Sequence, residues 1–90
     1  MNARETDEAL RAAGVDPQLY VIRGVPRDKL VGLSDGSVIL GPDDGGGWTA
    51  WAWERGRQTV YEQFPDEEQA CRWLYDAMIE MKRRYDAVRG

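Results

Sequence analysis

The stretch that decides the fold is residues 48–88, WTAWAWERGRQTVYEQFPDEEQACRWLYDAMIEMKRRYDAV, in which two strand-like segments precede a helical one. From Pro65 onward the apolar residues recur with the 3.6-residue period of a helix, along a stripe of Ala70, Leu74, Ala77, Met78, Met81, Tyr85 and Val88. Asp66 is placed to cap this helix together with Gln69, and basic residues gather toward its far end. The sequence therefore predicts a long amphipathic C-terminal helix.

The two segments before Pro65 predict a β-hairpin. Residues 48–54 and 58–64 have the composition of strands, and Gly56 between them suits the left-handed conformation of a short hairpin loop. A two-residue loop and a three-residue loop place opposite residues of the second strand beside Trp51 and Trp53. The register of this hairpin therefore stays open.

The tryptophans of this hairpin divide between two faces. Because side chains alternate along a strand, Trp48 shares one face with the alanines at positions 50 and 52, whereas Trp51 and Trp53 share the other. The alanines would let a helix approach closely, which favours the far side of the sheet for Trp51 and Trp53, where a partner could bind. The alternative is that the first helix or the core covers this pair, since tryptophan is highly buried on average.

The N-terminal part of the chain predicts a short helix followed by a strand. Residues 5–13 are good helix formers, with Thr6 as the expected N-cap and Gly14 as the stop. Residues 19–22, LYVI, have the β-branched and aromatic content of a strand.

Residues 30–40 predict a second hairpin. The apolar runs 30–33 and 38–40 flank Asp35 and Gly36, and an Asp-Gly pair between apolar runs is typical of a two-residue turn with positive φ. Residues 41–47 combine proline, aspartates and glycines, which predicts a mobile surface loop.

This order of elements predicts an α+β fold. We expect a single domain over residues 1–90, with an antiparallel meander sheet of four to five strands. A short N-terminal helix and a long C-terminal helix should pack on one face of the sheet. Nothing in the sequence fixes the oligomeric state.

The composition of the chain indicates which classes of partner to exclude and which cellular compartment to expect. A formal net charge of −4 and a pI near 4.7 argue against a protein that binds nucleic acid through a basic face. No stretch approaches the length of a membrane span, and the single cysteine, Cys71, can form no intramolecular disulfide. We therefore expect a cytoplasmic protein with neither nucleic acid nor membrane as a partner.

The residue types that carry catalysis are scarce. The chain has no histidine, which removes the commonest general base and metal ligand, so we expect no enzyme, no metal and no cofactor. Cys71 is interpreted as a small apolar residue of the last helix. Asp43 and Asp44, followed by three glycines, lack the spacing of a calcium loop and predict a solvated turn; the alternative is a contact loop for a basic partner.

A motif in the second half of the chain resembles a known family. Its positions are Trp48, Trp51, Trp53, Glu54-Arg55-Gly56, Phe64, Glu67 or Glu68, Ala70-Cys71 and Leu74. This pattern resembles small bacterial immunity proteins of contact-dependent and type VII polymorphic toxin systems, whose last strands and helix often read W-x-V-x-x-x-E-R-G, F, then D/E-E-x-A-C. The resemblance implies a protein that binds and blocks a cognate toxin domain, and the acidic balance would suit a basic nuclease toxin.

We therefore expect a stoichiometric protein inhibitor of the immunity type. The candidate contact residues are the tryptophans of the hairpin and nearby polar residues: Asp43, Asp44, Trp48, Trp51, Trp53, Tyr61 and Glu62. The alternative is a small accessory or regulatory domain, in which the same tryptophans line a groove for a small molecule or a peptide. The sequence does not identify the toxin.

Overall fold

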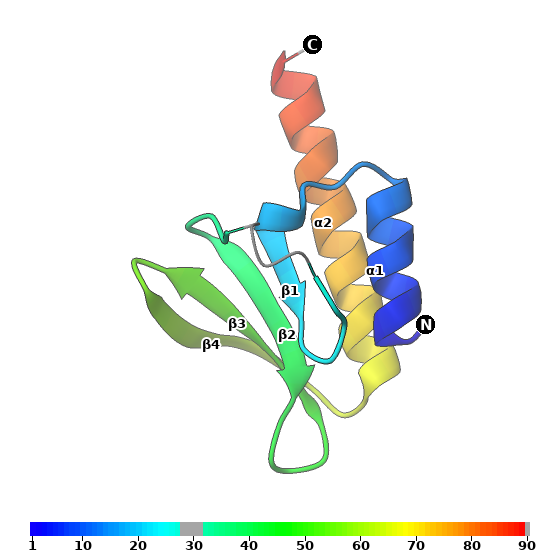
Figure 1. Cartoon of the computed structure of the whole chain (residues 1–90), viewed down its shortest axis with the longest axis vertical. Helices are drawn as coiled ribbons and strands as arrows, with labels where there is room; N and C mark the ends of the chain where they lie inside the picture. Colours follow the sequence, from blue (N-terminus) through cyan, green and yellow to red (C-terminus); the bar gives the residue numbers. More distant parts are fainter. Residues whose placement is uncertain (28–31, 90) are drawn as a thin grey trace.

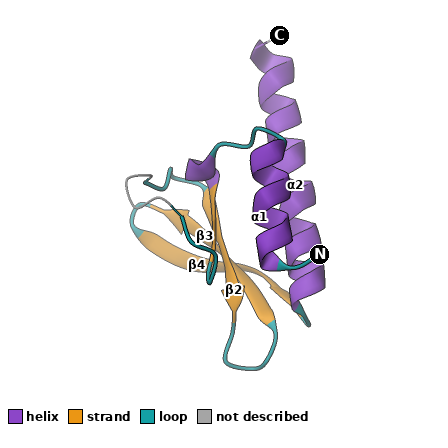
Figure 2. Ribbon diagram, turned by 45° about the vertical axis from the view of Figure 1, so that its right-hand side comes forward, coloured by secondary structure: helices purple, strands orange, loops and turns teal. Residues whose placement is uncertain are grey.

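A computed structural model describes residues 1–27 and 32–89 of the chain (Figure 1). In chain order the elements are α1 (Ala3–Ala12), the 3-10 helix η1 (Pro17–Leu19), β1 (Tyr20–Ile22), β2 (Ser37–Pro42), β3 (Trp48–Glu54), β4 (Arg57–Phe64) and α2 (Glu67–Arg89). The strands of the described part form one sheet in the order β1-β2-β3-β4. Both helices lie on the same side of this sheet (Figure 2). The α+β fold predicted from the sequence is confirmed.

The edge strand β1 departs from the predicted meander. Strands β2, β3 and β4 are antiparallel neighbours, but β1 pairs parallel to β2, with Tyr20 beside Val38. Adjacent parallel strands need a long crossover connection, which residues 23–36 supply. The expectation of a purely antiparallel sheet is therefore wrong at β1.

The hairpin predicted around Asp35 and Gly36 is also wrong. Gly36 does adopt a positive φ of 84° in a turn, but residues 32–34 are not a strand, and residues 30 and 31 lie outside the described part of the chain. The turn is instead bonded to β3, because the Gly36 N–H donates a hydrogen bond to the Trp53 carbonyl over 2.7 Å. The Asp-Gly turn thus leads into β2, but residues 32–34 directly before the turn form no strand that pairs with β2.

The first helix begins earlier than predicted. Asn2 is its N-cap, and a capping box joins the Asn2 side chain to the Glu5 N–H and the Glu5 side chain to the Asn2 N–H. Thr6, the predicted cap, is buried one turn into the helix, where its hydroxyl donates to the Asn2 carbonyl over 2.7 Å. Gly14, with a φ of 81°, follows the end of the helix as expected.

The long helix α2 is confirmed with its predicted cap. The Asp66 side chain accepts a hydrogen bond from the Gln69 N–H over 2.9 Å. α1 runs alongside α2 in the same direction (Figure 1), with Ala3 bonded to Glu67 at one end and Gly14 close to Lys82 at the other. The C-terminal end of α2 extends past the other described elements (Figure 1).

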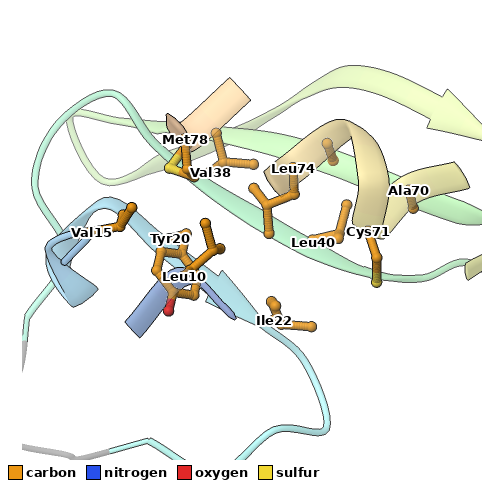
Figure 3. Packing of buried hydrophobic residues seen from close by; sticks show 11 residues of the cluster. Leu10, Val15, Tyr20, Ile22, Val38, Leu40, Ala70, Cys71, Leu74 and Met78 are labelled. Atoms are coloured by element: carbon orange, nitrogen blue, oxygen red, sulfur yellow. The ribbon is translucent and has the colours of Figure 1, made fainter. Parts of the chain in front are cut away.

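The core lies between the two helices and the sheet (Figure 3). Its buried members are Leu10, Val15, Tyr20, Ile22, Val38, Leu40, Ala50, Ala70, Cys71, Leu74 and Met78. Cys71 is fully buried there, in agreement with its interpretation as an apolar core residue. The core therefore occupies one face of the sheet and leaves the other face free of helices among the described residues.

Candidate protein-binding face

The hairpin of β3 and β4 closes through a two-residue turn. Arg55 and Gly56 have φ values of 50° and 77°, the pair of positive values that such turns require, and Glu54 pairs with Arg57. This register places Val60 beside Trp51 and Gln58 beside Trp53. The question that the sequence left open is thereby resolved.

The outer face, defined here as the sheet face opposite the helices, carries a row of apolar side chains across all four strands. Val21, Ile39, Trp51 and Val60 are successive cross-strand neighbours in this row. Ile39 is buried, Val21 and Trp51 are half-buried, and Val60 at the edge is 56% exposed. Trp51 therefore sits near the centre of a continuous apolar strip, with half-buried Trp53 on the same face of β3.

Arg23 lies across this face. Its guanidinium carbon is 4.6 Å from the centre of the Trp51 ring, within the range of a cation–π contact. Its Nη2 also donates to the Gln58 side chain over 3.2 Å. The arginine passes over Gly41, where a Cβ would approach the Arg23 Cδ to 2.7 Å. Arg23 and Gly41 therefore fit together, and the arginine is held against the tryptophan.

Arg23 was not among the residues predicted for this face. Side chains alternate between the two faces along a strand, so the position two residues after Val21 falls on the same face as Val21. Extending this alternation past the end of β1 would have placed Arg23 on the outer face. What the sequence could not supply was the parallel pairing of β1 with β2, which brings Arg23 beside Gly41 and over Trp51.

Asp43 organises the loop after β2. Its carboxylate accepts hydrogen bonds from the N–H groups of Gly45 and Gly47, over 2.9 and 3.1 Å, and from the Thr49 hydroxyl over 3.0 Å. These bonds indicate that Asp43 stabilises the loop. The carboxylate of the loop that faces solvent is that of exposed Asp44. The loop is also shorter than predicted, since residues 41 and 42 belong to β2.

Three of the predicted contact residues lie on the other face of the sheet. Trp48 packs against the core, and Tyr61 contacts Trp73 of α2, with ring centres 5.7 Å apart. A register shift between Ala50 and Trp51 makes this possible, because the bulge leaves Tyr61 without a partner in β3. Exposed Glu62 pairs with Ala50, which faces the helices. The predicted set is thus split, and of its tryptophans only Trp51 and Trp53 share the outer face.

The pKa values that depart from the ordinary belong to groups of the helix side. Burial, a hydrogen bond to Asp7 and the charge of Asp7 raise the pKa of Tyr20 to about 12. Burial also raises the pKa of the Cys71 thiol. The outer face instead offers two indole rings, aliphatic surface and one guanidinium, a set suited to binding.

Residues 1–27 and 32–89 contain no group of three or more acidic, cysteine or histidine side chains able to hold a metal ion. Neither helix in that part of the chain is long and apolar enough to cross a membrane. Comparison of the chain with protein-family models, curated proteins and solved structures finds no match.

Proposed function

We propose that this chain is a protein-binding module that docks through its outer face, and that it acts as a stoichiometric inhibitor of a bacterial toxin domain, like an immunity protein. The observation that supports this proposal is the placement of Trp51, under Arg23, in an apolar row on the sheet face opposite the helices. The motif of residues 48–74 resembles that of immunity proteins, and this resemblance is the reason for proposing a toxin domain as the partner.

Tryptophan and arginine suit the centre of an interface. They are enriched among residues that dominate binding energy, because each buries a large area and adds directional contacts. Here Arg23 is already held by Trp51 and Gln58, so docking would require little further ordering of its side chain. Exposed Val60 would add aliphatic area at the β4 edge.

Charge suits a basic partner at long range. The chain carries a formal net charge of −4, and exposed Asp44 and Glu54 lie near opposite ends of β3. In this proposal the acidic balance steers a basic toxin domain toward the chain, and the apolar row then makes the close contacts. The proposal places the chain in the cytoplasm, where its single cysteine stays reduced.

Two neighbouring residues of β4 provide a matched test. Val60 pairs with Trp51 of the outer face, whereas exposed Thr59 pairs with Ala52 on the helix side. The experiment titrates each purified toxin domain encoded beside the gene with the wild-type chain, Val60→Asp and Thr59→Asp, by calorimetry and by toxin activity. We expect one domain to bind the wild type 1:1 and lose its activity, and Val60→Asp to weaken binding by about tenfold or more.

The controls decide between the two function classes. Thr59→Asp should bind as the wild type does, and equal loss in both variants would place the interface elsewhere. If no toxin domain binds, but small molecules or peptides change the tryptophan fluorescence saturably, the chain is an accessory or regulatory domain instead.

A further inference from the structure

Arg23 is a cation without a carboxylate partner in the described chain. Its side chain is exposed, and no acid among residues 1–27 and 32–89 forms an ion pair with it. Within those residues its N–H donors make a single hydrogen bond, from Nη2 to the side-chain oxygen of Gln58. The contact with the Trp51 ring uses no hydrogen-bond acceptor. The guanidinium is therefore held in place while most of its donors stay open to a ligand.

The strand residues around Arg23 on the outer face supply no acid. The apolar row that contains Trp51 is uncharged along its length. The next row across the sheet joins Ser37, Trp53 and Gln58, which are uncharged as well. Arg23 is therefore a single positive charge above these two rows.

Docking on this face would cover Arg23 together with Trp51. The guanidinium carbon lies 4.6 Å from the centre of the Trp51 ring, so a partner that buries the exposed part of the ring also takes the guanidinium out of water. A buried charge without a partner of opposite sign is strongly unfavourable. A carboxylate meets this need, because it neutralises the charge and its oxygens match the parallel N–H groups of a guanidinium.

We propose that the outer face binds an aspartate or glutamate side chain on the surface of the partner, with the carboxylate on Arg23 and the apolar residues that flank it on the row of Trp51. This inference rests on the proposed function, since it names what the partner presents at the docking face. The net charge of −4 attracts a basic domain from a distance, but the contact itself is made by a local acid. Basic residues of the partner then lie toward exposed Asp44 and Glu54, near the two ends of β3.

Three blocked tripeptides serve as probes of this site. Each has leucine on both sides of a central glutamate, glutamine or lysine, and blocking removes the terminal charges. NMR of the isotope-labelled whole chain follows the indole N–H of Trp51, with that of Trp73 in α2 as the reference on the other side of the sheet. The titrations are made in about 0.1 M salt, where charges more than about 10 Å apart are largely screened.

The order of the three affinities tests the proposal. We expect the Kd of the glutamate peptide to be about fivefold lower than that of the glutamine peptide, with the lysine peptide binding most weakly. The net charge of −4 favours the lysine peptide at long range, so the expected order requires a local cation. Equal affinity for all three peptides, or binding of none, would overturn the proposal.

Variants assign the preference to Arg23. Arg23→Gln removes the guanidinium and should bind the glutamate and glutamine peptides equally. Arg23→Lys keeps the charge but loses the paired donors, so it should keep only part of the preference. The matched control is Arg72→Gln, which removes the same charge from an exposed arginine of α2 and should keep the full preference. A preference that survives Arg23→Gln would contradict the proposal.

Failure of this inference differs from failure of the proposed function. If a toxin domain binds 1:1 but the chain does not prefer the glutamate peptide, the inhibitor proposal stands and the carboxylate site is wrong. If the glutamate preference depends on Arg23 but no toxin domain binds, the carboxylate site is supported and its partner belongs to another class.

Discussion

Glu67, the first residue of α2, accepts a hydrogen bond from the backbone N–H of Ala3, the first residue of α1, over 2.8 Å. The N–H groups of a first helical turn have no partner within their own helix. A carboxylate from one helix therefore caps the start of the other. This bond joins residues far apart in the sequence and sets the two helices side by side at their N-terminal ends.

Removal of this carboxylate should loosen α1 from α2. We expect Glu67→Ala to lower the free energy of unfolding by about 1–2 kcal/mol, the usual cost of a lost helix cap. Urea denaturation measures the change, and exposed Glu68→Ala is the matched control, with little expected effect. Equal losses in the two variants would mean that helix-dipole effects, rather than the bond to Ala3, account for the role of Glu67.

The raised pKa of Tyr20 predicts that the folded chain loses stability at high pH. Its pKa is raised to about 12 by burial, by its hydrogen bond to Asp7 and by the Asp7 charge, whereas an ordinary tyrosine titrates near 10. Between these values the unfolded chain releases the Tyr20 proton and the folded chain keeps it. The free energy of unfolding should therefore fall as pH rises from about 10 to 12 and be insensitive to this group below pH 9.

Tyr20→Phe isolates this contribution. The variant should show a shallower fall of stability over the same pH range, because it retains every other titrating group. Denaturant titrations of both proteins from pH 8 to 12 make the comparison. Identical slopes in the two proteins would show that Tyr20 titrates normally.

Cys71 provides a probe of opening between the helices. Burial is the largest effect and raises the pKa of its thiol; the hydrogen bond to Thr6 acts in the opposite direction, and the Glu67 charge adds a lesser increase. The reactive thiolate should therefore be scarce in the folded chain, and a thiol reagent should label Cys71 only as fast as the structure opens. Ala12→Cys in a Cys71→Ala background places the thiol on the exposed side of α1 and should react at once. Fast labelling of native Cys71 would contradict its burial.

The long helix α2 and its cap were predictable because their information is local, whereas the start of α1 was misplaced because Thr6 was taken for the cap that Asn2 provides. Asp66 and Gln69 sit three residues apart, and their cap is present as predicted. The parallel pairing of Tyr20 with Val38 was not predictable, because an Asp-Gly turn looks the same whether or not a strand precedes it. The candidate face was predicted in part, because alternation along β3 placed Trp51 and Trp53 on the same face. The bulge that turns Tyr61 toward Trp73 could not be predicted, because no residue pattern in the sequence indicates it.

The contact between Arg23 and Gly41 predicts a coupled pair of substitutions. Gly41→Ala would bring a methyl group within 2.7 Å of the Arg23 Cδ, so the arginine must move from its place over Trp51. We expect Gly41→Ala to destabilise the chain by about 1–2 kcal/mol and to change the tryptophan fluorescence. In an Arg23→Ala background the same substitution meets no arginine and should cost clearly less. A double-mutant cycle by urea denaturation gives the coupling free energy, expected at about 0.5–1.5 kcal/mol. Additive losses would mean that Gly41 is required by the backbone of β2 and not by Arg23.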